Sequence, residues 1–78
     1  MKIKVKLYTI LKKYGEGKIG NDDTMVVSEY LTINGLLSRL SIPKKTGKVF
    51  LVNDFPKDDE YELHEGDEVK IMSFIGGG

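Results

Sequence analysis

The three glycines that close the sequence, Gly76, Gly77 and Gly78, have the residue type and spacing best suited to chemistry. Glycine has no Cβ and adopts the widest range of backbone conformations, so a glycine run can enter a narrow channel in another protein. Nothing on such a chain shields the terminal carbonyl of Gly78 from attack by a nucleophile. The same composition is also typical of an inert, flexible end, so composition alone leaves both interpretations open.

The rest of the sequence offers little for covalent catalysis or metal binding. It has no cysteine, which excludes disulfides and a thiolate nucleophile, so any sulfur that the protein handles cannot sit on a side-chain thiol. Its one histidine, His64, stands beside an expected turn, where a solvated or capping role is expected rather than metal ligation. No Ser/His/Asp constellation stands out. We therefore expect neither a metal site nor an enzyme active site.

Length and charge exclude several classes of protein. A chain of 78 residues has room for one domain, which we expect over residues 1–75, followed by a flexible tail at 76–78. The 12 basic and 12 acidic residues cancel, whereas a nucleic-acid binder usually carries a basic excess. No apolar run approaches the roughly 18 residues of a membrane span, and the alternating start lacks the apolar core of a signal peptide. We expect a cytoplasmic protein with no nucleic-acid or membrane partner.

The first half of the sequence predicts a strand and a helix that would help to position the tail. Strict alternation predicts a half-buried strand over residues 2–8. A long exposed connection follows over residues 9–24, with a short helical turn at 10–14. A helix is expected between an N-cap at Thr32 and a stop at Pro43. Its apolar residues recur at i, i+3, i+4 and i+7, namely Ile33, Leu36, Leu37 and Leu40.

The remaining segments predict further strands around this helix. The expected strands cover residues 25–30, 48–53 and 68–74, with a turn at 53–54, a polar loop at 56–60 and at most a short edge strand at 61–63. Phe50 and Phe55 are expected to pack in the core and in a loop. One helix among strands predicts an α+β domain with the helix across one face of a mixed sheet. Its first and last strands could pair in parallel near the centre, which would project the tail from a rigid body.

Alternation along the last expected strand predicts a surface that leads into the tail. If Val69 and Ile71 point to the core, Met72 and Phe74 point the other way, and Ile75 continues their line. Methionine and aromatic side chains are enriched at protein interfaces, so this strip is a candidate partner contact. The alternative is that these residues fill the core or cap the sheet edge.

Several short motifs resemble those of one family. Residues 63–78, with a Gly-Asp-Glu-Val turn and strand before the glycines, resemble the end of the molybdopterin synthase small subunit and of the thiamine sulfur carrier. Residues 52–54 resemble the ending of that family's third strand, and residues 32–37 resemble its helix start. The combination covers the whole chain. The resemblance therefore implies the ubiquitin-like β-grasp fold and the function of a sulfur carrier.

In this family, the carrier's terminal carboxylate receives and delivers sulfur. An α-carboxylate has a pKa of about 3.3–3.7, so Gly78 is ionised at neutral pH and needs activation. The resemblance implies that an E1-like adenylyltransferase supplies ATP and magnesium and forms a Gly78 acyl-adenylate. A persulfide sulfur donor then replaces the adenylate and leaves a thiocarboxylate. The acceptor would be a molybdopterin precursor held by the large subunit of a synthase, and the carrier itself would bind no cofactor.

The sequence also departs from the family pattern. Residues 73–75, Ser-Phe-Ile, stand where the molybdopterin subunit often carries a Pro-Pro pair, and Gly35 and Gly76 replace other common residues. The length and the long 9–24 connection fit molybdopterin biosynthesis better than the thiamine pathway. The alternatives within the family are a thiamine-pathway carrier and a ubiquitin-like modifier that forms isopeptide bonds with lysines. An alternative from another class is a β-grasp binding module with an inert tail.

Overall fold

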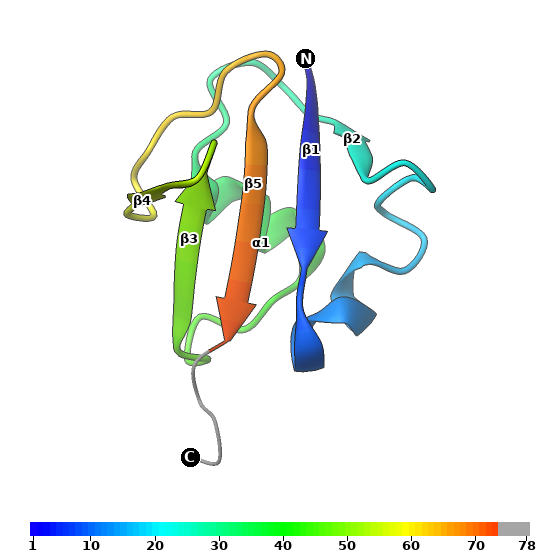
Figure 1. Ribbon diagram of the computed structural model, residues 1–78, viewed down its shortest axis with the longest axis vertical. Coiled ribbons are helices and arrows are strands. Elements are labelled where there is room, and N and C mark those ends of the chain that lie inside the picture. The colour runs from blue at the N-terminus through cyan, green and yellow to red at the C-terminus, as the bar shows by residue number, and fades with distance from the viewer. Residues whose placement is uncertain (74–78) are drawn as a thin grey trace.

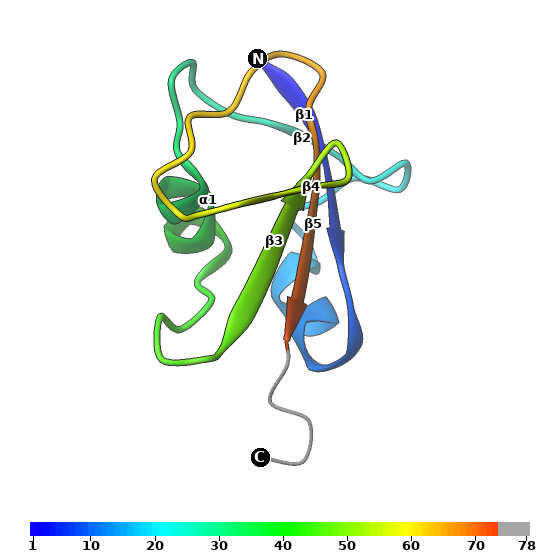
Figure 2. The ribbon, with the colours of Figure 1, turned by 60° about the vertical axis from the view of Figure 1, so that its left-hand side comes forward.

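The computed structural model describes residues 1–73, and these residues form a mixed sheet with one α-helix across one face (Figures 1 and 2). The sheet has five strands in the order β2-β1-β5-β3-β4. No helix in this part of the chain is long and apolar enough to cross a membrane. The predicted α+β architecture is confirmed. The elements in chain order are β1 (Lys2–Leu7), the 3₁₀-helix η1 (Thr9–Gly15), β2 (Thr24–Val26), α1 (Ile33–Leu40), β3 (Lys48–Val52), β4 (Phe55–Lys57) and β5 (Glu68–Ser73).

The first and last strands lie side by side at the centre of the sheet, as predicted. β1 and β5 are parallel, with Val5 opposite Val69. At the far end of this pair, the amide of Tyr8 donates to the carbonyl of Ile71 at 3.3 Å. β3 pairs antiparallel with the other side of β5. The strand that leads to the C-terminus is therefore held on both sides.

The helix begins at its predicted cap. Thr32 has an extended backbone, and its hydroxyl oxygen accepts a hydrogen bond from the Gly35 amide at 3.1 Å. The helix ends before Pro43 can stop it, because Ser41 takes the left-handed conformation with φ 60°. The Ser41 amide then donates to the Ser38 carbonyl at 3.1 Å, which closes the last turn.

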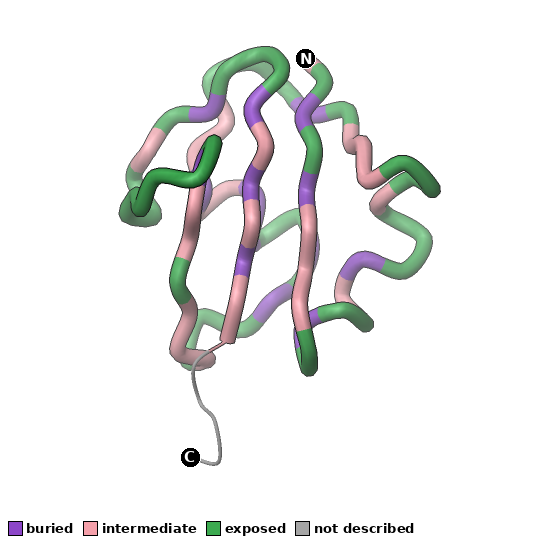
Figure 3. The backbone as a smooth tube through the Cα atoms, viewed as in Figure 1, coloured by how far each residue is buried: buried purple, intermediate pink, exposed green. Residues whose placement is uncertain are grey.

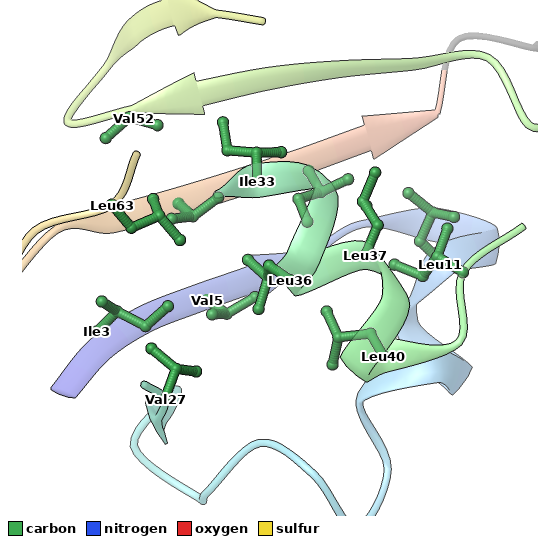
Figure 4. Packing of buried hydrophobic residues seen from close by; sticks show 13 residues of the cluster. Ile3, Val5, Leu11, Val27, Ile33, Leu36, Leu37, Leu40, Val52 and Leu63 are labelled. Carbon is green, nitrogen blue, oxygen red and sulfur yellow. The ribbon is translucent and has the colours of Figure 1, made fainter. Parts of the chain in front are cut away.

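The core lies between α1 and one face of the sheet (Figure 4). All four residues of the predicted helix stripe are buried, and they meet side chains from the three central strands. Leu11 of η1 joins them from the long connection after β1. The members of this cluster are Ile3, Val5, Leu11, Val27, Ile33, Leu36, Leu37, Leu40, Ile42, Val52, Leu63, Val69 and Ile71.

The second strand is shorter than the predicted range of 25–30. β2 pairs with β1 only from Thr24 to Val26, and Val26 lies opposite Lys2, the first residue of β1. The Val27 amide still donates to the Met1 carbonyl at 2.8 Å. The Met1 amino group in turn donates to the Val27 carbonyl at 2.7 Å, and after Val27 the chain leaves the sheet.

The prediction of a polar loop at 56–60 is wrong for its first two residues, which belong to β4. Asn53 and Asp54 both have positive φ, 53° and 72°, which is typical of the tight type I′ hairpin turn. That turn folds Phe55–Lys57 back as β4 against β3. Phe55 does not pack as expected, since 66% of it is exposed on this edge strand. Phe50 packs against the core, as expected.

The short strand of the predicted order is therefore β4, and it lies earlier than expected. The segment predicted as a short edge strand at 61–63 makes a single bridge, between Glu62 and Thr32. The sequence at 61–63 was a poor guide to the position of the short strand. The hairpin turn at 53–54 brings the chain back against β3 already at Phe55–Lys57.

Two residues of the family-like motifs bond to each other at the start of β5. The Asn53 amide nitrogen Nδ2 donates to Asp67 Oδ1 at 2.9 Å, and the Glu68 backbone amide donates to Asn53 Oδ1 at 3.0 Å. Asp67, only 7% exposed, also accepts from the backbone amide of His64 at 2.9 Å. These bonds join the β3–β4 turn to the turn before β5. They fix the point at which β5 enters the sheet.

The buried helix face gives a first prediction. Leu37→Ala should lower the free energy of unfolding by about 2–5 kcal/mol, because Leu37 is 3% exposed and its loss leaves a cavity. Ser38→Ala, on the exposed face of the same helix, is the matched control and should change it by less than about 0.5 kcal/mol. Urea unfolding measures both, and equal losses would show that the stripe is not packed.

The Asn53–Asp67 bond gives a second prediction. Asn53→Ala and Asp67→Ala should each cost about 1–3 kcal/mol, because each leaves polar groups without a partner. Alanine is disfavoured at the positive φ of residue 53, so Asn53→Ala also loses stability for a reason unrelated to the bond. A double-mutant cycle cancels this loss, because it is the same in the single and the double variant. Unfolding of the single and double variants should give a coupling energy of at least about 0.5 kcal/mol. Additive losses would mean that the two side chains do not stabilise each other.

Candidate functional site

Of the residues predicted to form the site, Met72 is the one that the structure describes. The other five lie outside the described residues, so their roles stay predictions: Phe74, Ile75, Gly76, Gly77 and Gly78. What the structure adds is the position from which this segment starts. Ser73 is the last described residue, at the end of β5.

β5 runs between its two neighbours toward the end of the domain opposite the N-terminus (Figure 1). Its last residue, Ser73, lies opposite Lys48, the first residue of β3. On the other side, β1 pairs with β5 as far as Leu7 opposite Ile71. The last described residue is therefore supported by the sheet at one end of the molecule.

Burial alternates along β5 between buried and intermediate residues (Figure 3), as expected for a strand with one face on the core. Val69 and Ile71 are fully buried, whereas Lys70 and Met72 are only partly buried. The face to which Met72 belongs lies opposite α1, and we call it the open face (Figure 2). The prediction that Met72 points away from the core is confirmed.

The apolar surface around Met72 extends onto β3. In the antiparallel register, Met72 lies opposite Val49, and Leu51 is the next residue of β3 on the same face. Val49 is 40% exposed and Leu51 is half-buried. We call Val49, Leu51 and Met72 the apolar strip.

Sequence reasoning missed the two β3 members of this strip. The apolar run over residues 49–52 is typical of a strand buried on both faces, yet only Val52 of that run is fully buried. The two faces of β3 differ in burial instead, because α1 covers only one of them. Alternation within the run, combined with the pairing of β3 and β5, is the signal that would have found Val49 and Leu51.

Lysines lie on the β1 side of the apolar strip on the open face. Lys6 of β1 lies beside Lys70 of β5, and Lys70 lies opposite Leu51. The Lys70 ammonium donates to Asp54 at 2.9 Å, and this bond raises the pKa of Lys70 above its usual value. Lys6 Nζ lies 3.5 Å from a carboxylate oxygen of Glu68. The described part of the site is thus an apolar strip with a cationic margin.

His64 lies far from this strip, in the turn before β5. Its side chain is 66% exposed, and Nδ1 lies 3.8 Å from Asp67 Oδ2. The solvated role predicted for this histidine is confirmed. Within residues 1–73, no three His, Cys, Asp or Glu side chains gather in a way that could hold a metal ion.

Comparisons with known proteins agree with this geometry. The structure is similar to the crystal structure of SAMP1 from Haloferax volcanii, with a TM-score of 0.71, 16% sequence identity and all of each chain covered. This likeness confirms the predicted β-grasp fold. A search of curated proteins gave no significant match. The ThiS family model matches residues 5–78, nearly the whole chain and its glycine end. The chain therefore belongs to the ThiS family of ubiquitin-like sulfur carriers.

Proposed function

We propose that this protein carries sulfur as a thiocarboxylate on Gly78. The observation that carries the proposal is that the family match extends through the terminal glycines. The absence of cysteine from the sequence agrees with it, because the sulfur must then be held by an acyl carbon rather than by a side chain. The protein acts as a carrier and a non-catalytic subunit, not as an enzyme.

The terminal carboxylate needs an activating partner because it is an anion and a poor electrophile at neutral pH. In the proposed first step, a carboxylate oxygen of Gly78 attacks the α-phosphorus of ATP and pyrophosphate leaves. An E1-like adenylyltransferase supplies the ATP and magnesium. The terminal sulfur of a persulfide donor then attacks the acyl carbon and AMP leaves. A thiol finally cleaves the resulting S–S bond, which releases the thiocarboxylate and forms a disulfide.

The open face supports a role for the folded domain in docking. The apolar strip of Val49, Leu51 and Met72 lies beside the end of β5, where the described chain stops. Residues 74–78 follow directly in the sequence, so a partner that binds the strip can also receive Phe74, Ile75 and the glycines. Aromatic and methionine side chains are common in interface cores. We therefore assign partner docking to the strip together with residues 74–77.

We further propose that the sulfur acceptor belongs to molybdopterin synthesis, with a large synthase subunit as the second partner. The long connection between β1 and β2, which includes η1, supports this pathway over the thiamine pathway. The direct comparison is to offer the thiocarboxylated protein to each pathway's acceptor system. Sulfur transfer only to the thiamine acceptor would redirect the proposal. Conjugates with lysines that survive reduction would favour the modifier function.

The carrier function predicts a specific change in mass. After incubation with ATP, magnesium, the E1-like enzyme of the same organism and a sulfur donor, the protein should gain the mass of one oxygen replaced by one sulfur. Intact-protein mass spectrometry measures this gain, which deletion of Gly78 should abolish. The deletion should leave the urea midpoint unchanged, because glycine has no side chain that could add apolar surface to a core. If an enzyme that is active on its known carrier produces no gain, the inert-tail binding module becomes the better interpretation.

The docking role predicts that the strip contributes to affinity. Val49→Asp and Met72→Asp should each weaken binding to the activating enzyme by at least about tenfold, or about 1.4 kcal/mol. Phe55→Asp is the matched control, since Phe55 is 66% exposed and lies opposite Val52, whose side chain faces the core and not the open face. Isothermal titration calorimetry gives the affinities, and urea unfolding shows whether each variant is folded. Equal effects of all three substitutions would argue against a localised docking strip.

A further inference from the structure

We propose that the activating partner presents an acidic protein surface to the open face, and that the lysines of β1 and β5 on this face speed its association. This inference rests on the proposed function, because it names the chemistry of the surface that receives the carrier. It is argued from the arrangement of charges on the two central strands. Sequence composition gives no hint of it, since the total charge is zero.

Strand alternation gathers lysines on the open face. Lys2, Lys4 and Lys6 occupy every second position of β1, where Ile3 and Val5 point to the core. The parallel register then places Lys6 beside Lys70 of the neighbouring strand. The same arrangement that builds the core thus places these lysines together on β1 and β5. We call Lys2, Lys4, Lys6 and Lys70 the cationic band.

Carboxylates offset only part of this charge. Lys6 lies near Glu68, and Lys70 is bonded to Asp54. Among the described residues, Lys4 has no ion pair, and Lys2 interacts with Asp22 only at longer range. Four lysines therefore face two paired carboxylates and the more distant Asp22, so the band keeps an excess of positive charge.

Many of the balancing carboxylates lie elsewhere. The acidic segment 58–62 leaves the sheet after β4 and contacts the start of α1, where the Asn34 amide donates to the Asp59 carbonyl at 2.9 Å. This segment also carries the bridge between Glu62 and Thr32. Asp59 interacts with Lys48, but the acidic side chains of this segment stand apart from the lysines of the open face. Such a separation orients an approaching charged partner and raises the association rate.

The composition of the open face favours a protein partner over the other anionic surfaces. The apolar strip, bordered by lysines, matches an interface with an apolar centre and a polar rim. A nucleic acid would not use Val49 and Met72, and the neutral chain lacks the basic excess that phosphate binding requires.

A second copy of this chain fits poorly on the open face. A face-to-face pair would bring two cationic bands together, and like charges across an interface are unfavourable. The edge at β4 is also a poor site for strand addition, because Pro56 has no amide to donate. The remaining occupant is a protein with an apolar centre and acidic rim, which is the surface that we assign to the activating enzyme.

The test compares association rates of charge-reversal variants with the E1-like enzyme by stopped-flow fluorescence. The Lys2→Glu/Lys4→Glu variant changes lysines with no close ion pair on the open face. The Lys12→Glu/Lys13→Glu variant makes the same change in net charge on exposed residues of η1. At low ionic strength, the first variant should associate roughly tenfold more slowly than the wild type, and the control less than about twofold. The difference should vanish near 1 M salt, where the Debye length is only about 3 Å.

The outcomes separate this inference from the proposed function. If the wild type becomes thiocarboxylated but its association is independent of salt, the acidic surface is wrong and the carrier function stands. Equal slowing of both variants would mean that net charge, not the open face, controls the rate, which also overturns the inference. It is overturned as well if a single-stranded RNA oligomer binds the wild type and the Lys2→Glu/Lys4→Glu variant loses that binding. If no complex and no mass gain are found with an active enzyme, both proposals fail.

Discussion

The parallel pairing of β1 with β5 is the contact on which the rest of the structure depends. It joins the first strand to the last, and β2, β3 and β4 extend the sheet from these two strands. Because side chains alternate along a strand, one register fixes both faces at once. Val5 and Val69 face α1, while Lys6 and Lys70 face outward. A slip by one residue would bury lysines, so the core and the cationic open face are two results of one constraint.

The turn motifs that resemble the family precede β5, whereas the residue to which we assign the chemistry, Gly78, follows it in the sequence. Asn53 and Asp67 bond to each other where β5 begins, and they hold the turns that set its register. Gly78 follows beyond the other end of the strand. The motif residues therefore act on the fold rather than on sulfur. This separation explains how a domain can present the same terminal carboxylate while its surface adapts to different partners.

The open face joins two physical requirements of a carrier. In the complex that we propose, the apolar strip supplies buried area, while the lysines act at longer range and favour fast encounter. A carrier that must leave one partner for the next gains from a fast association that does not depend on a large apolar surface. The pairing of Lys70 with Asp54 and of Lys6 with Glu68 also anchors part of the band, so the charges stand at defined positions beside the strip.

Local patterns in the sequence determined the elements whose causes are local. The alternation of β1, the cap at Thr32, the buried stripe of α1 and the outward direction of Met72 all follow from neighbours within a few residues. The glycine end suggested the terminal carboxylate as the reactive group, and that assignment stays a proposal. The tertiary structure alone decided where β2 stops, that Phe55–Lys57 forms a strand, and that Val49 and Leu51 join Met72 on the open face. These features depend on backbone partners and on which face a helix covers, and both are set by residues far away in the chain.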